Sequence, residues 1–124
     1  MPTLPLDADN FQATITDNAT VIVDFWAPWC GPCRNFAPTF EAAAEKRPDI
    51  VFAKVNTEEQ QAIAAAFNIR SIPTLMIFRD QIAIYSEAGA LAPAGFDQLI
   101  EQAMALDMDQ VRKEIAGQSP SDAT

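Results

Sequence analysis

Histidine is absent from this chain of 124 residues, and cysteine occurs only twice. Without histidine there can be no Ser-His or Cys-His catalytic pair, no histidine proton shuttle and no histidine metal ligand. Two cysteines alone cannot form a zinc site of four thiolates. Acid–base chemistry in this protein must therefore fall on carboxyl groups and on the thiols themselves.

Basic residues are also scarce. Eight Lys and Arg stand against 17 Asp and Glu, which gives a formal net charge of −9. Residues 1–24 and 97–124 each carry a net charge of −4, so only −1 remains for residues 25–96. Nucleic-acid binding relies on clustered Lys and Arg, so we expect no nucleic acid as a partner. Because the central region is nearly neutral, we expect that bulk charge does not select what it binds.

Long hydrophobic runs are missing as well. No segment approaches the roughly 18 apolar residues of a membrane helix. The first ten residues contain no Lys or Arg and no long apolar stretch, unlike a signal peptide. We therefore expect no membrane association and a location in the cytoplasm, where thiols are kept reduced. A cysteine pair in that compartment is expected to be catalytic or metal-binding.

Apolar residues nevertheless make up 49% of the chain, enough for one domain whose core needs no disulfide staples. Strands alternate with helices and end in a hairpin, which predicts an α/β sheet with helices on both faces. The expected strands are a weak edge strand within residues 1–6, then Val21–Trp26, Ile50–Val55, Thr74–Phe78 and Ile82–Ser86. The expected helices are a short one capped by Asp7 or Asp9 and running to about Ile15, one over 31–46 kinked by Pro38, one over 58–67, and one beginning near Pro93.

Two further regions leave alternatives open. The hairpin turn Asp80-Gln81 lacks the usual glycine, so either Gln81 adopts a positive φ or the turn is of another type. Apolar residues continue at helical spacing through Ile115, so the last helix extends or a second one follows, up to Gly117. We expect a domain over residues 1–107 and a C-terminal helical extension with a flexible tail over 108–124.

Both cysteines lie between a strand and a helix, as Cys30-Gly-Pro-Cys33. Cys30 falls at the helix N-terminus, where unpaired amides and the helix dipole favour a thiolate, the nucleophilic form. Cys33 lies one turn further along on the same side, close enough to close a small disulfide ring. We expect Cys33 to be less exposed and to act as the resolving thiol. A C-x-x-C pair after a strand in a βα unit is typical of a redox site.

The stretch Trp26-Ala-Pro-Trp-Cys-Gly-Pro-Cys33 resembles the active site of thioredoxins. The resemblance extends from about Leu6 to Leu106 and implies a thioredoxin fold, with three layers and a mixed central sheet. Four further segments match the family. Pro38 matches its kinking proline, and Lys54-Val-Asn56 matches the end of its next strand. Ile69-Arg-Ser-Ile-Pro-Thr74 matches its cis-proline loop, and Gly89-Ala90 matches its glycine loop.

The segment APWCGPCRNFAP, together with the later segment NIRSIPT, is most similar to the thioredoxin-2 subgroup. That subgroup usually carries an N-terminal zinc-binding segment with two further cysteine pairs. This chain has neither pair, so no metal site is predicted.

The resemblance also implies roles for single residues. The resemblance implies that Asp24 is the buried acid–base group for Cys33. It also implies that Lys54 is the lysine that approaches Asp24. The alternatives are a solvated strand-end carboxylate and an ordinary surface lysine. An exposed Trp29 would offer a flat apolar contact to an incoming peptide.

Around the pair, the resemblance implies a cis bond at Ile72-Pro73, with Ile72 offering backbone hydrogen bonds to an extended substrate. From the bond alone we would expect the trans form. The remaining expected substrate-binding residues are Gly31, Pro32, Gly89 and Ala90.

The implied function is a monomeric protein-disulfide reductase acting through a redox disulfide between Cys30 and Cys33. Its partners would be thioredoxin reductase and disulfide-containing substrate proteins. The electrons would come from NADPH through that reductase, with no cofactor bound to this chain.

Three alternatives remain open at this point. One is an oxidase or isomerase in an oxidising compartment, against which the Gly-Pro dipeptide counts. Another is an interaction or chaperone module in which the cysteines are incidental. The last is an iron–sulfur centre whose thiolates come from two chains.

Overall fold

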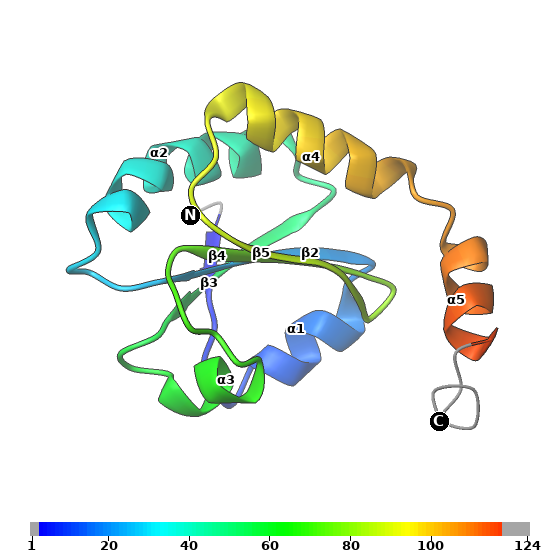
Figure 1. Cartoon of the computed structure of the whole chain (residues 1–124), viewed down its shortest axis with the longest axis horizontal. Helices are drawn as coiled ribbons and strands as arrows, with labels where there is room; N and C mark the ends of the chain where they lie inside the picture. The colour runs from blue at the N-terminus through cyan, green and yellow to red at the C-terminus, as the bar shows by residue number, and fades with distance from the viewer. Residues whose placement is uncertain (1–2, 118–124) are drawn as a thin grey trace.

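A computed structural model describes residues 3–117 and shows a five-stranded sheet between helices (Figure 1). The elements in chain order are β1 (Thr3–Pro5), α1 (Phe11–Asp17), β2 (Thr20–Trp26), α2 (Gly31–Lys46), β3 (Val51–Asn56), α3 (Gln61–Ala66), β4 (Thr74–Arg79), β5 (Ile82–Ala88), α4 (Pro93–Ala105) and α5 (Met108–Gly117).

The strands lie in the order β1-β3-β2-β4-β5, so the strand that leads to the cysteines is central. β3 pairs in parallel with both β1 and β2, whereas β4 is antiparallel to β2 and to β5. Helix α2 makes the crossover that parallel pairing of β2 and β3 requires. The sheet is therefore mixed, as expected.

Helices cover both faces of the sheet, with α2 and α4 on one face and α1 and α3 on the other (Figure 1). Side chains of β2 alternate between the two cores, with Ile22 packed toward α2 and α4 and with Val21, Val23 and Phe25 toward α1 and α3. This explains why β2 is apolar almost throughout. The core under α2 and α4 contains four stacked or edge-on phenylalanines, namely Phe36, Phe40, Phe52 and Phe96.

Two predicted helix starts are wrong for local reasons. Helix α3 begins at Gln61 instead of residue 58, because the carbonyl and side chain of Asn56 accept the next amides and form a turn. Helix α1 begins at Phe11 with no side-chain cap at its N-terminus. The Asp7 carboxylate instead accepts amides within the preceding turn.

The β4–β5 turn has φ angles of 51° at Asp80 and 70° at Gln81. The first of the two predicted alternatives is therefore correct, and both central residues adopt the left-handed conformation of a type I′ turn. A register shift at Ile77 and Phe78 follows on the β4 side.

The C-terminal part forms a separate helix, α5, beyond the end of α4. Arg79 of β4 donates to the carbonyl oxygen of Ala103 at 2.7 Å, which caps the last turn of α4. Arg112 of α5 pairs with Asp80 in the hairpin turn at 2.9 Å, and Met108 is buried. The predicted tail, 118–124, lies outside the described residues. Within residues 3–117, no helix is both long and apolar enough to cross a membrane.

Candidate active site

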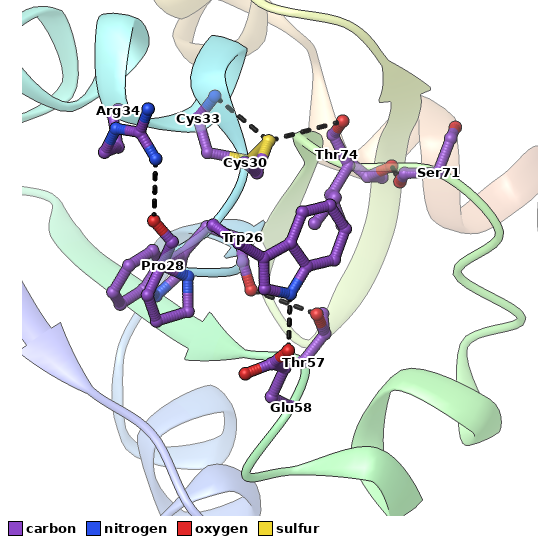
Figure 2. Close-up of a disulfide and its surroundings, with 11 residues drawn as sticks. Trp26, Pro28, Cys30, Cys33, Arg34, Thr57, Glu58, Ser71 and Thr74 are labelled. Atoms are coloured by element: carbon purple, nitrogen blue, oxygen red, sulfur yellow. Dashed lines mark hydrogen bonds between the residues drawn. A yellow bond between two sulfur atoms is a disulfide. The ribbon is translucent and has the colours of Figure 1, made fainter.

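The two cysteines lie where the central strand β2 gives way to helix α2. They are joined by a disulfide, with 5.2 Å between their Cα atoms (Figure 2). Cys30 is the N-cap of α2, and its Sγ accepts the amide of Cys33 at 3.2 Å. Cys30 is 4% exposed and Cys33 is 2% exposed, so both sulfurs lie in a nearly closed site. The amide at the helix start faces the sulfur that would carry negative charge after reduction.

A loop before β4 forms the wall opposite the cysteines. The Ile72–Pro73 peptide bond is cis, and the Ile72 carbonyl oxygen lies 3.8 Å from the Sγ of Cys30. Ile72 packs against the small cluster formed by Ala27, Cys30 and Cys33. The amide of Gly89 donates to the Pro73 carbonyl at 2.8 Å, which brings the glycine loop to the same place. Ala90 follows in that loop and is exposed.

The loop between β2 and α2 is held at both ends. Thr57 donates its amide, at 2.8 Å, and its hydroxyl, at 3.1 Å, to the carbonyl oxygen of Trp26. Arg34 reaches back from α2 to the carbonyl oxygen of Pro28 at 3.0 Å (Figure 2). These contacts fix the path of the chain into Cys30. No pattern in the sequence indicated that Thr57 or Arg34 would have this role.

The first turn of α2 and the residue before it form the outer surface of the site. Trp29 is 64% exposed, which is unusual for a large aromatic side chain and leaves its ring available to a partner. Its indole N–H donates to the carboxylate of Glu58 in the turn after β3. Gly31 is half-buried and Pro32 is exposed. Nothing in the sequence pointed to Glu58.

Asp24 is 1% exposed, and neither carboxyl oxygen has a hydrogen-bond partner among residues 3–117. Burial raises the pKa of Asp24 from 3.8 to about 7, Lys54 opposes that rise and Glu41 adds to it. A solvated strand-end carboxylate, the alternative, is therefore wrong.

Lys54 occupies the register position beside Asp24 on β3. Its ammonium group lies 4.6 Å from the ring centre of Trp26, so its stem and charge rest against the sheet instead of extending freely into solvent.

No group of three or more His, Cys, Asp or Glu side chains within 3–117 is arranged to hold a metal ion. The chemistry that the described geometry supports is thiol–disulfide exchange at the Cys30–Cys33 pair. The helix start favours a thiolate, and a buried carboxyl group with a raised pKa lies on the central strand below.

Comparison with known proteins agrees with this geometry. Residues 2–102 match the Thioredoxin family profile, which covers most of the chain. The chain belongs to the thioredoxin family. As a thioredoxin it is a thiol–disulfide oxidoreductase and a protein-disulfide reductase, and the predicted recognition, fold and reaction are confirmed.

Several individual thioredoxins are similar to this one. A Streptomyces coelicolor protein named "Putative thioredoxin 2" is 54% identical over 116 residues, which cover 94% of this chain and 87% of that protein. Thioredoxin 1 of Synechococcus elongatus is 46% identical over 86 residues, covering 68% and 80% respectively. A solved structure of a mutant thioredoxin from Halobacterium salinarum superposes with a TM-score of 0.77 at 33% identity, covering 85% of this chain and 93% of that one.

Proposed function

We propose that this thioredoxin takes electrons from NADPH through thioredoxin reductase and passes them to disulfides in partner proteins. The observation that carries the proposal is the position of the Cys30 sulfur. It lies between an amide at the start of α2 and the Ile72 carbonyl, beside the exposed Trp29. A nucleophile, a stabilising donor and a backbone acceptor for a substrate chain are therefore within one small region.

In the first step the Cys30 thiolate attacks one sulfur of a substrate disulfide. A bond forms between Cys30 and that sulfur, the substrate disulfide breaks, and the other substrate sulfur leaves as a thiolate that takes up a proton. The amide of Cys33 stabilises the attacking thiolate. The product is a mixed disulfide between the two proteins.

In the second step Cys33 resolves the mixed disulfide. Asp24 accepts the Cys33 thiol proton, and the resulting thiolate attacks the Sγ of Cys30. The intermolecular bond breaks, the second substrate sulfur leaves as a thiolate and is protonated, and the Cys30–Cys33 disulfide forms. The pKa of about 7 suits Asp24 to this proton transfer near neutral pH, and Lys54 opposes a further rise of that pKa.

The substrate lies across the surface formed by the two loops. Trp29, Gly31 and Pro32 contact it from the α2 side. From the other side the Ile72 backbone hydrogen-bonds to an extended substrate segment next to Pro73, and Gly89 and Ala90 border the groove. The Gly89–Pro73 hydrogen bond supports this arrangement because it joins the two loops on that side.

We further propose that the protein acts as a monomer in the cytoplasm, where thiols are kept reduced. The Gly-Pro dipeptide between the cysteines, which resembles that of reducing thioredoxins, supports a reducing role in that compartment. We also propose a functional domain over residues 1–107 with 108–124 as an extension.

An insulin-reduction assay with NADPH and thioredoxin reductase tests the proposal. We expect insulin precipitation together with NADPH consumption, and neither in the Cys30→Ser variant. A second arm replaces the enzymatic electron source with dithiothreitol. Activity only in the dithiothreitol arm would contradict the electron source, whereas activity in neither arm would contradict the reductase mechanism itself.

A further inference from the structure

A cavity of about 230 Å³ lies between α2 and the β1 edge of the sheet. Its lining residues come from β1 and the residue after it, β2, β3, α2 and the turn after β3, namely Thr3, Pro5, Leu6, Trp26, Glu41, Lys54, Asn56 and Glu59. Asp24 is in register with Lys54 on the neighbouring strand, so the two side chains leave the sheet on the same face. The charged residues that line the cavity are therefore Glu41, Glu59 and Lys54, the register neighbour of Asp24.

Glu41 is held in place at this cavity by the N-terminal strand. The Thr3 hydroxyl lies 3.1 Å and 2.9 Å from the two carboxylate oxygens of Glu41 and donates to them. Thr3 is only 7% exposed, so this contact is sheltered from water. Glu41 follows Cys33 by eight residues on α2, about two helical turns, which places it on the same face as the resolving thiol. The Glu41 carboxylate therefore lines the same cavity as Lys54, the register neighbour of Asp24.

We propose that Glu41 is a positioning residue for disulfide reduction: held by Thr3, it opposes Lys54 at the cavity and makes Asp24 a stronger proton acceptor for Cys33. This inference rests on the proposed role of Asp24 as the proton acceptor for Cys33. It assigns the short strand β1 a part in the chemistry, because β1 supplies the hydroxyl that holds Glu41.

The charged groups around Asp24 shift its pKa in opposite directions. The ammonium group of Lys54 on β3 lowers the pKa of Asp24, and the carboxylate of Glu41 on α2 raises it. Glu59, from the turn after β3, also lines the cavity. Glu41 makes Asp24 a stronger base for a thiol, because a nearby negative charge disfavours a second one. Without Glu41, the lowering of the Asp24 pKa by Lys54 would be less opposed.

The test compares Glu41→Gln with Glu45→Gln. The first substitution keeps the size of the side chain and an oxygen acceptor for Thr3 but removes the charge. Glu45 is an exposed residue one turn further along α2, so its substitution makes the same charge change at a greater distance. The readouts are the titration midpoint of the ¹³C-labelled Asp24 carboxyl group in the reduced protein, followed by NMR, and the pH profile of insulin reduction driven by dithiothreitol.

We expect Glu41→Gln to lower the Asp24 midpoint by about 0.5 pH unit and to move the pH profile in the same direction. We expect Glu45→Gln to leave both unchanged. Equal midpoints in Glu41→Gln and Glu45→Gln would overturn the proposal. If the Asp24 midpoint moves while the pH profile does not, the electrostatic role of Glu41 is supported and the assignment of Asp24 as proton acceptor is overturned instead.

If Glu41→Gln does not fold, Thr3→Val provides a second route. It removes the hydroxyl that holds Glu41 while the carboxylate stays in the chain. We expect it to lower the Asp24 midpoint by less than Glu41→Gln does, because a released Glu41 moves toward solvent. An unchanged midpoint in a folded Thr3→Val protein would overturn the part assigned to β1.

Discussion

Asp24 and Lys54 lie side by side on β2 and β3, on the face of the sheet covered by α2, yet the Asp24 carboxyl group has no hydrogen-bond partner among residues 3–117. The Lys54 ammonium group instead rests over the ring of Trp26. A buried acid with an opposite charge nearby but no direct bond keeps its proton near neutral pH, and both stability and chemistry depend on this.

Stability is expected to fall as the pH rises through the titration of Asp24. Its pKa is about 7 in the folded protein and 3.8 as an ordinary carboxyl group, so the folded state binds the proton more tightly. The loss of folding stability caused by ionising the buried Asp24 is absent below pH 3.8, grows between pH 3.8 and pH 7, and is complete above pH 7. It amounts to at most about 4 kcal/mol, since one pKa unit corresponds to about 1.4 kcal/mol.

Asp24→Asn should therefore be more stable than the wild type at pH 8, by a few kcal/mol, and close to it at pH 4. Urea unfolding of the reduced proteins at both pH values measures this difference. Asp17→Asn, at an exposed position on α1, serves as the control and should show no such change between the two pH values. Equal stability of Asp24→Asn and wild type at pH 8 would contradict the raised pKa.

Substitutions of the two cysteines should block different steps of the reaction. Cys30→Ser is expected to abolish insulin reduction, because it removes the nucleophilic thiol at the start of α2. Cys33→Ser should still attack a substrate but lack the resolving thiol, so a mixed disulfide should accumulate. Non-reducing gel electrophoresis and mass spectrometry of the trapped species check this. A mixed disulfide that formed equally well in Cys30→Ser would reverse the two roles.

Trp29 is expected to contribute to substrate binding through its exposed ring. Trp29→Ala should lower kcat/KM for insulin reduction by about tenfold, mainly by raising KM, because a large flat contact is lost. Trp29→Phe keeps much of the ring and should lose less. Glu58→Gln retains an acceptor for the indole N–H and should stay near wild type, whereas Glu58→Ala should raise KM. A fall in kcat alone would point to a role in the chemical steps.

The hairpin turn offers a stabilising substitution far from the site. Gln81 has a φ of 70°, which costs a side-chain-bearing residue energy that glycine does not lose. Gln81→Gly should raise the free energy of unfolding by about 0.5–1 kcal/mol, after the entropy that glycine adds to the unfolded chain is included. Urea unfolding measures it, and Gln110→Gly within α5 is the control expected to destabilise. A loss of stability in Gln81→Gly would contradict the type I′ turn.

A chain that ends at residue 107 tests the proposed domain boundary. Because α5 contacts the turn rather than the cysteines, the truncated chain should reduce insulin with an unchanged kcat/KM. Its stability should fall by about 1–3 kcal/mol, mostly from the loss of the buried Met108, since the half-exposed Arg112–Asp80 pair contributes little. An inactive but folded truncated chain would show that α5 belongs to the functional unit.

The local parts of this structure could be predicted from the sequence because neighbouring residues determine them. Val21–Trp26 is apolar except for Asp24, a pattern that predicts a central strand covered on both faces. Gly31 and Pro32 start α2 directly after Cys30, so the position of the cysteines at a helix N-terminus follows from their order.

Contacts between distant segments could not be predicted in this way. Thr3 and Glu41 are 38 residues apart, and Trp29 and Glu58 are 29 apart. Neither pair has a local signature, since each is an ordinary polar residue until the fold brings it to its partner. The period of α2 places Glu41 on the face of Cys33 and is the one signal that could have drawn attention to it. The start of α3 was missed for a local reason, because the carbonyl and side chain of Asn56 accept the amides of the next residues and form a turn.

The pairing of β2 with β4 has a consequence for partly folded chains. Cys30 and Cys33 come from the segment that follows β2, whereas Ile72 and Pro73 come from the segment that precedes β4, and Asp24 opposite Leu75 marks where the two halves meet. A chain in which this pairing has not formed already holds both thiols but lacks the wall against which a substrate backbone lies. Reductase activity is therefore expected only after both halves of the sheet have joined.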